Sequence, residues 1–184
     1  MKLIVLSFAT FICISANAEP YIPAEDSARI VRAATRLVVA KPSDWTFAVI
    51  TEMSSNKYVQ FAAEDRVITF DFPIFAALGP HTPGRLRDGN CSAEPPAKKA
   101  GEVENRYRSK EEETRITKLL NTMQIQWRYR YCLSFTKEGQ RVGYNLSIIG
   151  SLDAPKTVPT FVESVLKEAY LIPVVRGIRI ETDE

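Results

Sequence analysis

The chain has few of the residues from which recognisable catalytic and metal sites are built. Its 184 residues include one histidine, His81, and three cysteines. Structural zinc sites use four cysteine and histidine ligands, and loss of Cys13 with the export signal described below would leave only three such residues, so we expect no metal. The sequence also has no Gly-rich phosphate loop, no nucleophile-elbow serine and no zinc signature. We therefore expect no cofactor and no catalytic residues, and we predict that the protein is not an enzyme.

An excess of charge of one sign is missing as well. Lys and Arg number 24 and Asp and Glu number 22, which gives a formal net charge of +2. Nucleic-acid binding relies on many basic contacts to phosphates, so this balance excludes it as the expected function. Beyond the N-terminus no apolar run approaches the ~18 residues of a membrane span, so we expect no stable membrane insertion.

The N-terminus has the order of a cleavable export signal. Lys2 precedes an almost unbroken apolar run over residues 3–14, and Ala16-Asn17-Ala18 forms a small-x-small cleavage site. We predict cleavage after Ala18 and a periplasmic protein. Residues 19–184 are then enough for a single domain with a sizeable core.

Cleavage would remove Cys13 and leave two cysteines, Cys91 and Cys132. In an oxidising compartment two cysteines favour one disulfide bond. The alternative is a pair of buried free thiols.

Residues 125–149 carry the clearest pattern in the chain. Both arms alternate with period two around the turn residues Lys137-Glu138-Gly139, which predicts an antiparallel hairpin. One side of the hairpin is aromatic and the other is rich in arginine. The aromatic side holds Trp127, Tyr129, Tyr131, Leu133 and Phe135, and the opposite side holds Arg128, Arg130, Cys132, Arg141 and Asn145.

The remaining elements are predicted from hydrophobic periodicity and turn residues. Helices are expected over residues 24–40, from about 109, and over 157–170. Strands are expected over 45–53, 57–63 and 66–72, where Pro73 would end the pairing, and an edge strand is considered over 174–180. Residues 79–108 have no periodicity and read as a long irregular loop. The order α-β-β-β-loop-α-β-β-α predicts an α+β fold, an antiparallel sheet with helices packed on one face.

The two sides of the hairpin have different expected roles. Three amphipathic helices need a sheet face to cover, so we interpret the aromatic row as core, with a ligand platform as the alternative. The arginine side is the candidate partner-binding surface, since guanidinium groups pair bidentately with carboxylates, and its alternative is a solvated polar face. The candidates are Arg128, Arg130, Arg141 and Asn145, joined by Arg85 and Arg87 of the loop.

One rival interpretation is a secreted hydrolase. Asp71 with Glu64 or Asp65 would supply a carboxylate pair. Solvent-facing acids in strands and turns are the more common explanation of such residues.

The element order, together with Lys57-Tyr-Val-Gln-Phe61 on the second strand, resembles the type III secretion chaperone-like domains over residues 24–170. The resemblance implies a protein-binding domain without catalytic residues. The export signal and the cysteine-bearing loop depart from that family, and together they resemble a periplasmic immunity protein.

We therefore expect an exported protein-binding module, an immunity-type inhibitor that neutralises a secreted toxin or effector by direct binding. A periplasmic chaperone or envelope assembly factor is the alternative among binding proteins. A homo-oligomer is left open.

Overall fold

The computed structural model describes residues 20–40, 47–79, 87–136 and 138–182. These residues form helices, strands and short helical turns in the following order: α1 (Ala24–Val39), β1 (Phe47–Glu52), β2 (Tyr58–Glu64), β3 (Val67–Leu78), β4 (Arg87–Ser92), β5 (Val103–Arg106), α2 (Lys110–Thr122), β6 (Trp127–Phe135), β7 (Arg141–Leu152), the 3-10 turn η1 (Pro155–Thr157), α3 (Val158–Ser164), the π-helical turn η2 (Val165–Ala169) and β8 (Ile178–Thr182). The predicted export signal lies outside the described residues.

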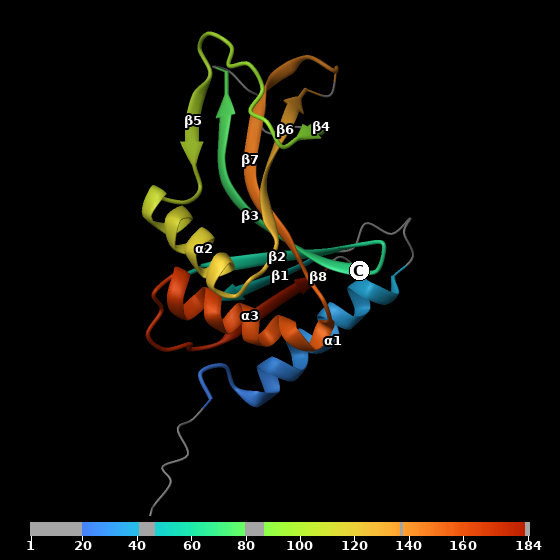
Figure 1. Cartoon of the computed structure of the whole chain (residues 1–184), viewed down its shortest axis with the longest axis vertical. Coiled ribbons are helices and arrows are strands. Elements are labelled where there is room, and N and C mark those ends of the chain that lie inside the picture. Colours follow the sequence, from blue (N-terminus) through green and yellow to red (C-terminus); the bar gives the residue numbers. More distant parts are fainter. Residues whose placement is uncertain (1–19, 41–46, 80–86, 137, 183–184) are drawn as a thin grey trace, which may run out of the picture.

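The strands form one antiparallel sheet in the order β4-β6-β7-β3-β2-β1-β8. Two different strands follow one another along one edge of β3, because β2 pairs with its first half and β5 with its second. The long strands β3 and β7 bend, and they join an upper part that carries β4, β5 and β6 to a lower part with β1, β2 and β8 (Figure 1). The α+β class with an antiparallel sheet is as predicted.

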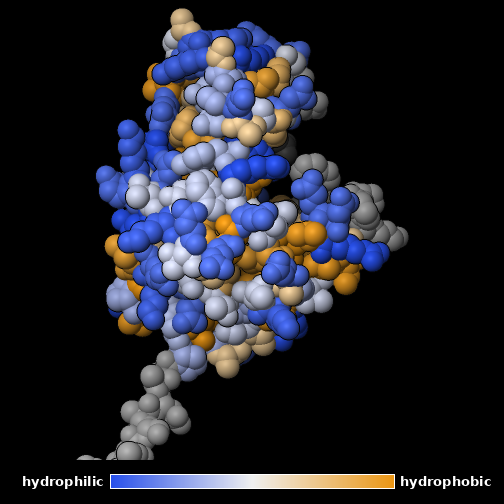
Figure 2. All heavy atoms as spheres, in the orientation of Figure 1, coloured by the Kyte–Doolittle hydropathy of each residue, from blue (hydrophilic) through white to orange (hydrophobic). Residues whose placement is uncertain are grey.

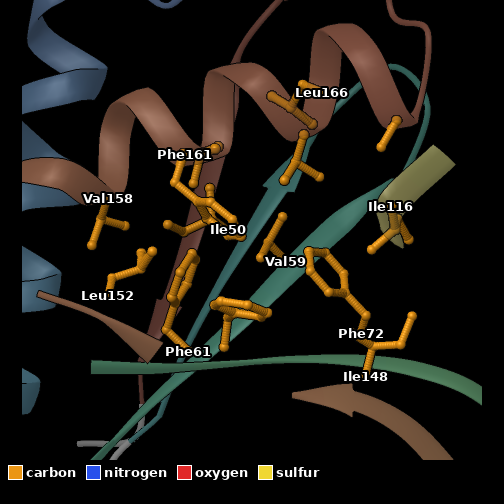
Figure 3. Packing of buried hydrophobic residues seen from close by; sticks show 14 of the residues in the cluster. Ile50, Val59, Phe61, Phe72, Ile116, Ile148, Leu152, Val158, Phe161 and Leu166 are labelled. Atoms are coloured by element: carbon orange, nitrogen blue, oxygen red, sulfur yellow. The ribbon is translucent and has the colours of Figure 1, made fainter. Parts of the chain in front are cut away.

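Helices cover one face of this sheet, as expected. Phe61 of β2 and Phe72 of β3 point from the sheet toward Phe161 of α3 (Figure 3), and Phe70 of β3 packs against the same ring. The Phe70 and Phe161 rings stack with centroids 4.8 Å apart, and Phe61 meets the same ring edge-on at 6.0 Å. All four rings are buried, so this aromatic cluster is the centre of the core.

The second helix begins where its capping sequence predicts. The Ser109 hydroxyl accepts the backbone N–H of Glu112, and the Glu112 carboxylate accepts the backbone N–H of Ser109. This reciprocal capping box satisfies two of the N–H groups that a helix start leaves unpaired.

The expected end of the third strand at Pro73 is wrong. Strand β3 continues through Pro73 to Leu78. Pairing tolerates the missing proline N–H because the register shifts between Pro73 and Phe75, which leaves Ile74 in a bulge. The Ile74 carbonyl then accepts the N–H of Tyr107 at 2.9 Å and of Arg108 at 3.3 Å.

The description of residues 79–108 as an irregular loop is also wrong in part, because β4 and β5 lie within it. Neither strand has an apolar alternation of its own. Strand β4 is held by β6, where Cys91 stands opposite Cys132 and the two form the predicted disulfide bond. Strand β5 is held by the C-terminal half of β3.

The aromatic side of the hairpin is less covered than predicted. Trp127 and Tyr129 are half-buried and lie at the edge of α2. The Trp127 indole N–H donates to Asn121 at 2.9 Å, and the Tyr129 hydroxyl donates to Glu113 at 3.0 Å. Burial and this hydrogen bond raise the pKa of Tyr129 to about 12.

Candidate binding groove

The face of the sheet opposite the helices carries the side chains that alternate with the core. Strand register places Gln60, Asp71, Ile149 and Arg128 in one row across β2, β3, β7 and β6. Successive side chains of a strand point to opposite faces, and the neighbours of these residues include the buried Phe61, Phe70 and Ile148. We call this side of the sheet the outer face.

The larger of two recesses on the outer face is a cavity of about 620 Å³. It lies over the lower ends of β6 and β7 and the β2–β3 hairpin. Its apolar lining includes Phe47, Ala62, Val67, Trp127 and Ile149, and its charged lining is Glu64, Asp65, Asp71, Arg128 and Arg130. We call it the apolar pocket. In the view of Figure 2 the surface is indented between the upper and the lower parts of the molecule.

The second recess has a volume of about 300 Å³ and is mainly polar. We call it the polar pocket. Its lining consists of Tyr58, Gln60, Asp71, Pro73, Asp88, Tyr107, Arg130, Asn145 and Ser147. Gln60, Asp71 and Arg130 line both pockets, so the two recesses form one continuous outer groove.

An ion pair stands where the two pockets meet. Nη2 of Arg130 donates to Oδ2 of Asp71, and both side chains keep part of their surface exposed. Burial raises the pKa of the Asp71 carboxyl, and the Asp88 carboxylate raises it too. The nearby Arg130 guanidinium lowers this pKa, but the net shift is upward. A side-chain hydrogen bond from Ser147 lowers the pKa of Asp71, and Nε of Arg130 is buried without a hydrogen-bond partner among the described residues.

The predicted partner-binding residues are only partly brought together. Arg128, Arg130 and Asn145 line the outer groove, and the Asn145 amide donates to Asp88 at 2.8 Å. Arg128 is exposed and makes no ion pair with any residue that the structure describes.

The other arginines are placed differently. Arg141 donates to the Ala97 carbonyl at 2.9 Å and lies 3.6 Å from the buried Glu102 carboxylate. It therefore holds the segment between β4 and β5 and does not line the groove. Arg85 lies outside the described residues, and for Arg87 only the backbone, paired with Phe135, is described.

The carboxylates considered for a hydrolase, those of Glu64, Asp65 and Asp71, all line the apolar pocket. Glu64 stands opposite Val67, which is four residues from Asp71 along β3. Four residues of strand span about 13 Å between backbone positions. Asp65 lies further along, in the turn between the strands, and the ionic partner of Asp71 is Arg130. His81 lies outside the described residues.

Several groove residues were not singled out from the sequence. Tyr58 and Gln60 could have been placed on the outer face, because they alternate with the apolar Val59 and Phe61. Tyr107 and Asp88 carry no such signal. Asp88 reaches the polar pocket because β4 pairs with β6. Tyr107 reaches it because its backbone N–H donates to the carbonyl of Ile74 in the bulge.

No group of three or more His, Cys, Asp or Glu side chains among the described residues is arranged to hold a metal ion. None of the helices in the described ranges is long and apolar enough to cross a membrane. Comparison of the chain with protein-family models, with curated proteins and with solved structures finds no match.

Proposed function

We propose that this protein is an exported protein-binding module and that the outer groove is the place where its partner docks. The observation that carries the proposal is the continuous recess across four strands, apolar over about 620 Å³ and polar over about 300 Å³. Binding sites are concave and mainly apolar, with a few polar groups that fix orientation. The outer groove has this composition.

The rigidity of the groove supports the same proposal. Its floor is hydrogen-bonded sheet, and its upper rim, β4, is tied to β6 by the Cys91–Cys132 bond. A preformed surface loses little conformational entropy on association, which favours affinity. The disulfide bond also agrees with export to an oxidising compartment.

Within this class, an immunity-type inhibitor that neutralises a secreted toxin remains our specific proposal. An inhibitor needs one partner and tight binding, and a rigid groove favours both. A chaperone or envelope assembly factor would instead bind many clients weakly.

Site-specific photo-crosslinking in living cells tests the proposal. A photoreactive residue replaces Gln126, which is exposed and lines the apolar pocket, or Val39, an exposed control on α1. We expect one discrete adduct from position 126 and none from position 39. A ladder of adducts from position 126 would favour the chaperone, and adducts from position 39 alone would contradict the proposal.

The inhibitor proposal has its own test once the adduct is identified. Expression of that partner in the same compartment should arrest growth, and co-expression of this protein should restore it. An Ala62→Trp variant, which fills the apolar pocket, should fail to restore growth. A partner without any toxicity would contradict the inhibitor assignment and leave the binding module in place.

A further inference from the structure

The charge of the outer groove points to the chemistry of its partner. Among the residues that the structure describes, four carboxylates line it, those of Glu64, Asp65, Asp71 and Asp88, against the two guanidinium groups of Arg128 and Arg130. This described lining therefore carries a net charge of −2. Electrostatic complementarity favours a basic occupant and penalises an acidic one.

The polar pocket concentrates this acidic character. Asp71 and Asp88 both line it, and the repulsion between them helps to raise the pKa of Asp71. A cationic group placed between them would relieve that repulsion. The lining also includes Tyr58 and Tyr107, and Tyr107 is 58% exposed. Tyrosine rings attract a Lys or Arg head group through their π faces.

The exposed part of the ion pair is open to an occupant of the groove. The Arg130 and Asp71 side chains keep 38% and 22% of their surface exposed. A lysine or arginine of the partner can therefore approach the Asp71 carboxylate, and a backbone carbonyl of the same segment can approach the Arg130 guanidinium.

The two pockets adjoin along β3. They meet at Asp71, and the next residue of β3 on the outer face, Pro73, lines the polar pocket alone. Residues two apart on an extended chain are separated by about 6.6 Å. An extended segment that lies along the groove can therefore place different side chains in the two pockets, and i and i+2 are the nearest pair on one side of such a segment.

We propose that the outer groove recognises an extended segment of the partner protein, with an apolar side chain in the apolar pocket and, two residues away, a lysine or arginine in the polar pocket. This inference rests on the proposed function and names the chemistry of its partner. The arginine-rich strand suggests a partner that presents carboxylates. The groove favours a basic partner instead, because Arg130 and Arg141 are already paired with Asp71 and Glu102.

The probe is the capped peptide Gly-Leu-Ser-Arg-Ser-Leu-Gly, which offers leucine two residues from arginine in either chain direction. Two matched peptides replace the arginine by neutral citrulline or by glutamate. Binding to the exported chain is followed by chemical-shift changes of backbone amides. We expect the arginine peptide to bind about tenfold more tightly than the citrulline peptide, and the glutamate peptide to bind most weakly.

Two protein variants locate the effect. Asp88→Asn should reduce the preference for arginine over citrulline, whereas Glu181→Gln on β8, which does not line the groove, should leave it unchanged. Equal affinity for the three peptides, no binding at millimolar concentration, or a preference for glutamate would each overturn the inference. If crosslinks from position 126 persist in that case, the protein-binding function stands and only the chemistry assigned to the partner fails.

Discussion

Glu52 is a carboxylate with no exposed surface, at the end of β1. It accepts hydrogen bonds from the Ser54 and Ser55 hydroxyls and from the backbone N–H groups of Ser54, Ser55 and Arg176. Burial alone would raise the pKa of Glu52, but these hydrogen bonds outweigh it and lower the pKa to about 2. The bonds fix the turn into β2 and the chain that leads to β8.

This carboxylate should make stability depend on pH. Its pKa is lower in the folded state than in the unfolded state, so its contribution is complete above pH 4.5 and is lost as the pH falls toward 2. The loss should reach at most about 3 kcal/mol in the free energy of unfolding. Urea unfolding at pH 7 and pH 3 measures it. Glu52→Gln should reduce the difference in the free energy of unfolding between the two pH values, and the exposed Glu181→Gln should not. An equal difference in the unaltered protein and in both variants would contradict the assignment.

Two aromatic residues should differ in what their truncation costs. Phe161 is buried among Phe61, Phe70 and Phe72, so Phe161→Ala should lower the free energy of unfolding by about 3–5 kcal/mol. Trp127 is half-buried, and Trp127→Ala should cost about half as much. Equilibrium unfolding compares them. A larger loss for Trp127→Ala would mean that the hairpin, not the phenylalanine cluster, is the centre of the core.

Among the elements, those with local signals could be predicted from the sequence. Helix α2 has its capping box, and β6 and β7 have period two with a turn between them. The disulfide bond was predicted from two cysteines in an oxidising compartment. Alternation placed Cys132 on the side of Arg128 and Arg130, which is why part of the groove could be foreseen.

Elements that depend on distant partners could not be predicted. The proline in β3 is tolerated because of a bulge against β7, and β4 has no apolar alternation of its own. The ion pairs of Arg130 and Arg141 likewise join residues 59 and 39 positions apart in the chain. From the sequence alone, Arg130 and Arg141 therefore appeared to have no ionic partner within the protein.

Strand β4 should be the element most sensitive to reduction. The bond closes 41 residues, and the chain-entropy model gives it a stabilisation of roughly 4 kcal/mol as an upper value. The double variant Cys91→Ser/Cys132→Ser should lose most of that stability, and amides of Arg87–Ser92 should exchange with solvent faster than those of β1 and β2. Equal acceleration in all strands would show that the bond stabilises the whole sheet and has no special effect on β4.

At the scale of the whole molecule, helices occupy one face of the sheet and leave the other hollowed. The chain has a net charge of +2, but the described lining of the outer groove has twice as many carboxylates as guanidinium groups. Overall composition therefore predicts little about the partner, whereas the groove supports a basic, partly apolar segment of another protein.

The central claim is that the outer groove binds a partner protein, and its most direct test is the affinity of the crosslinked partner, measured by calorimetry. Ala62→Trp fills the apolar pocket, and Val39→Trp adds the same side chain to an exposed position on α1. We expect Ala62→Trp to weaken binding by about 100-fold or more, a loss typical of a blocked central contact, and Val39→Trp to bind like the unaltered protein. Unchanged affinity of a correctly folded Ala62→Trp variant, or a loss confined to Val39→Trp, would contradict the claim.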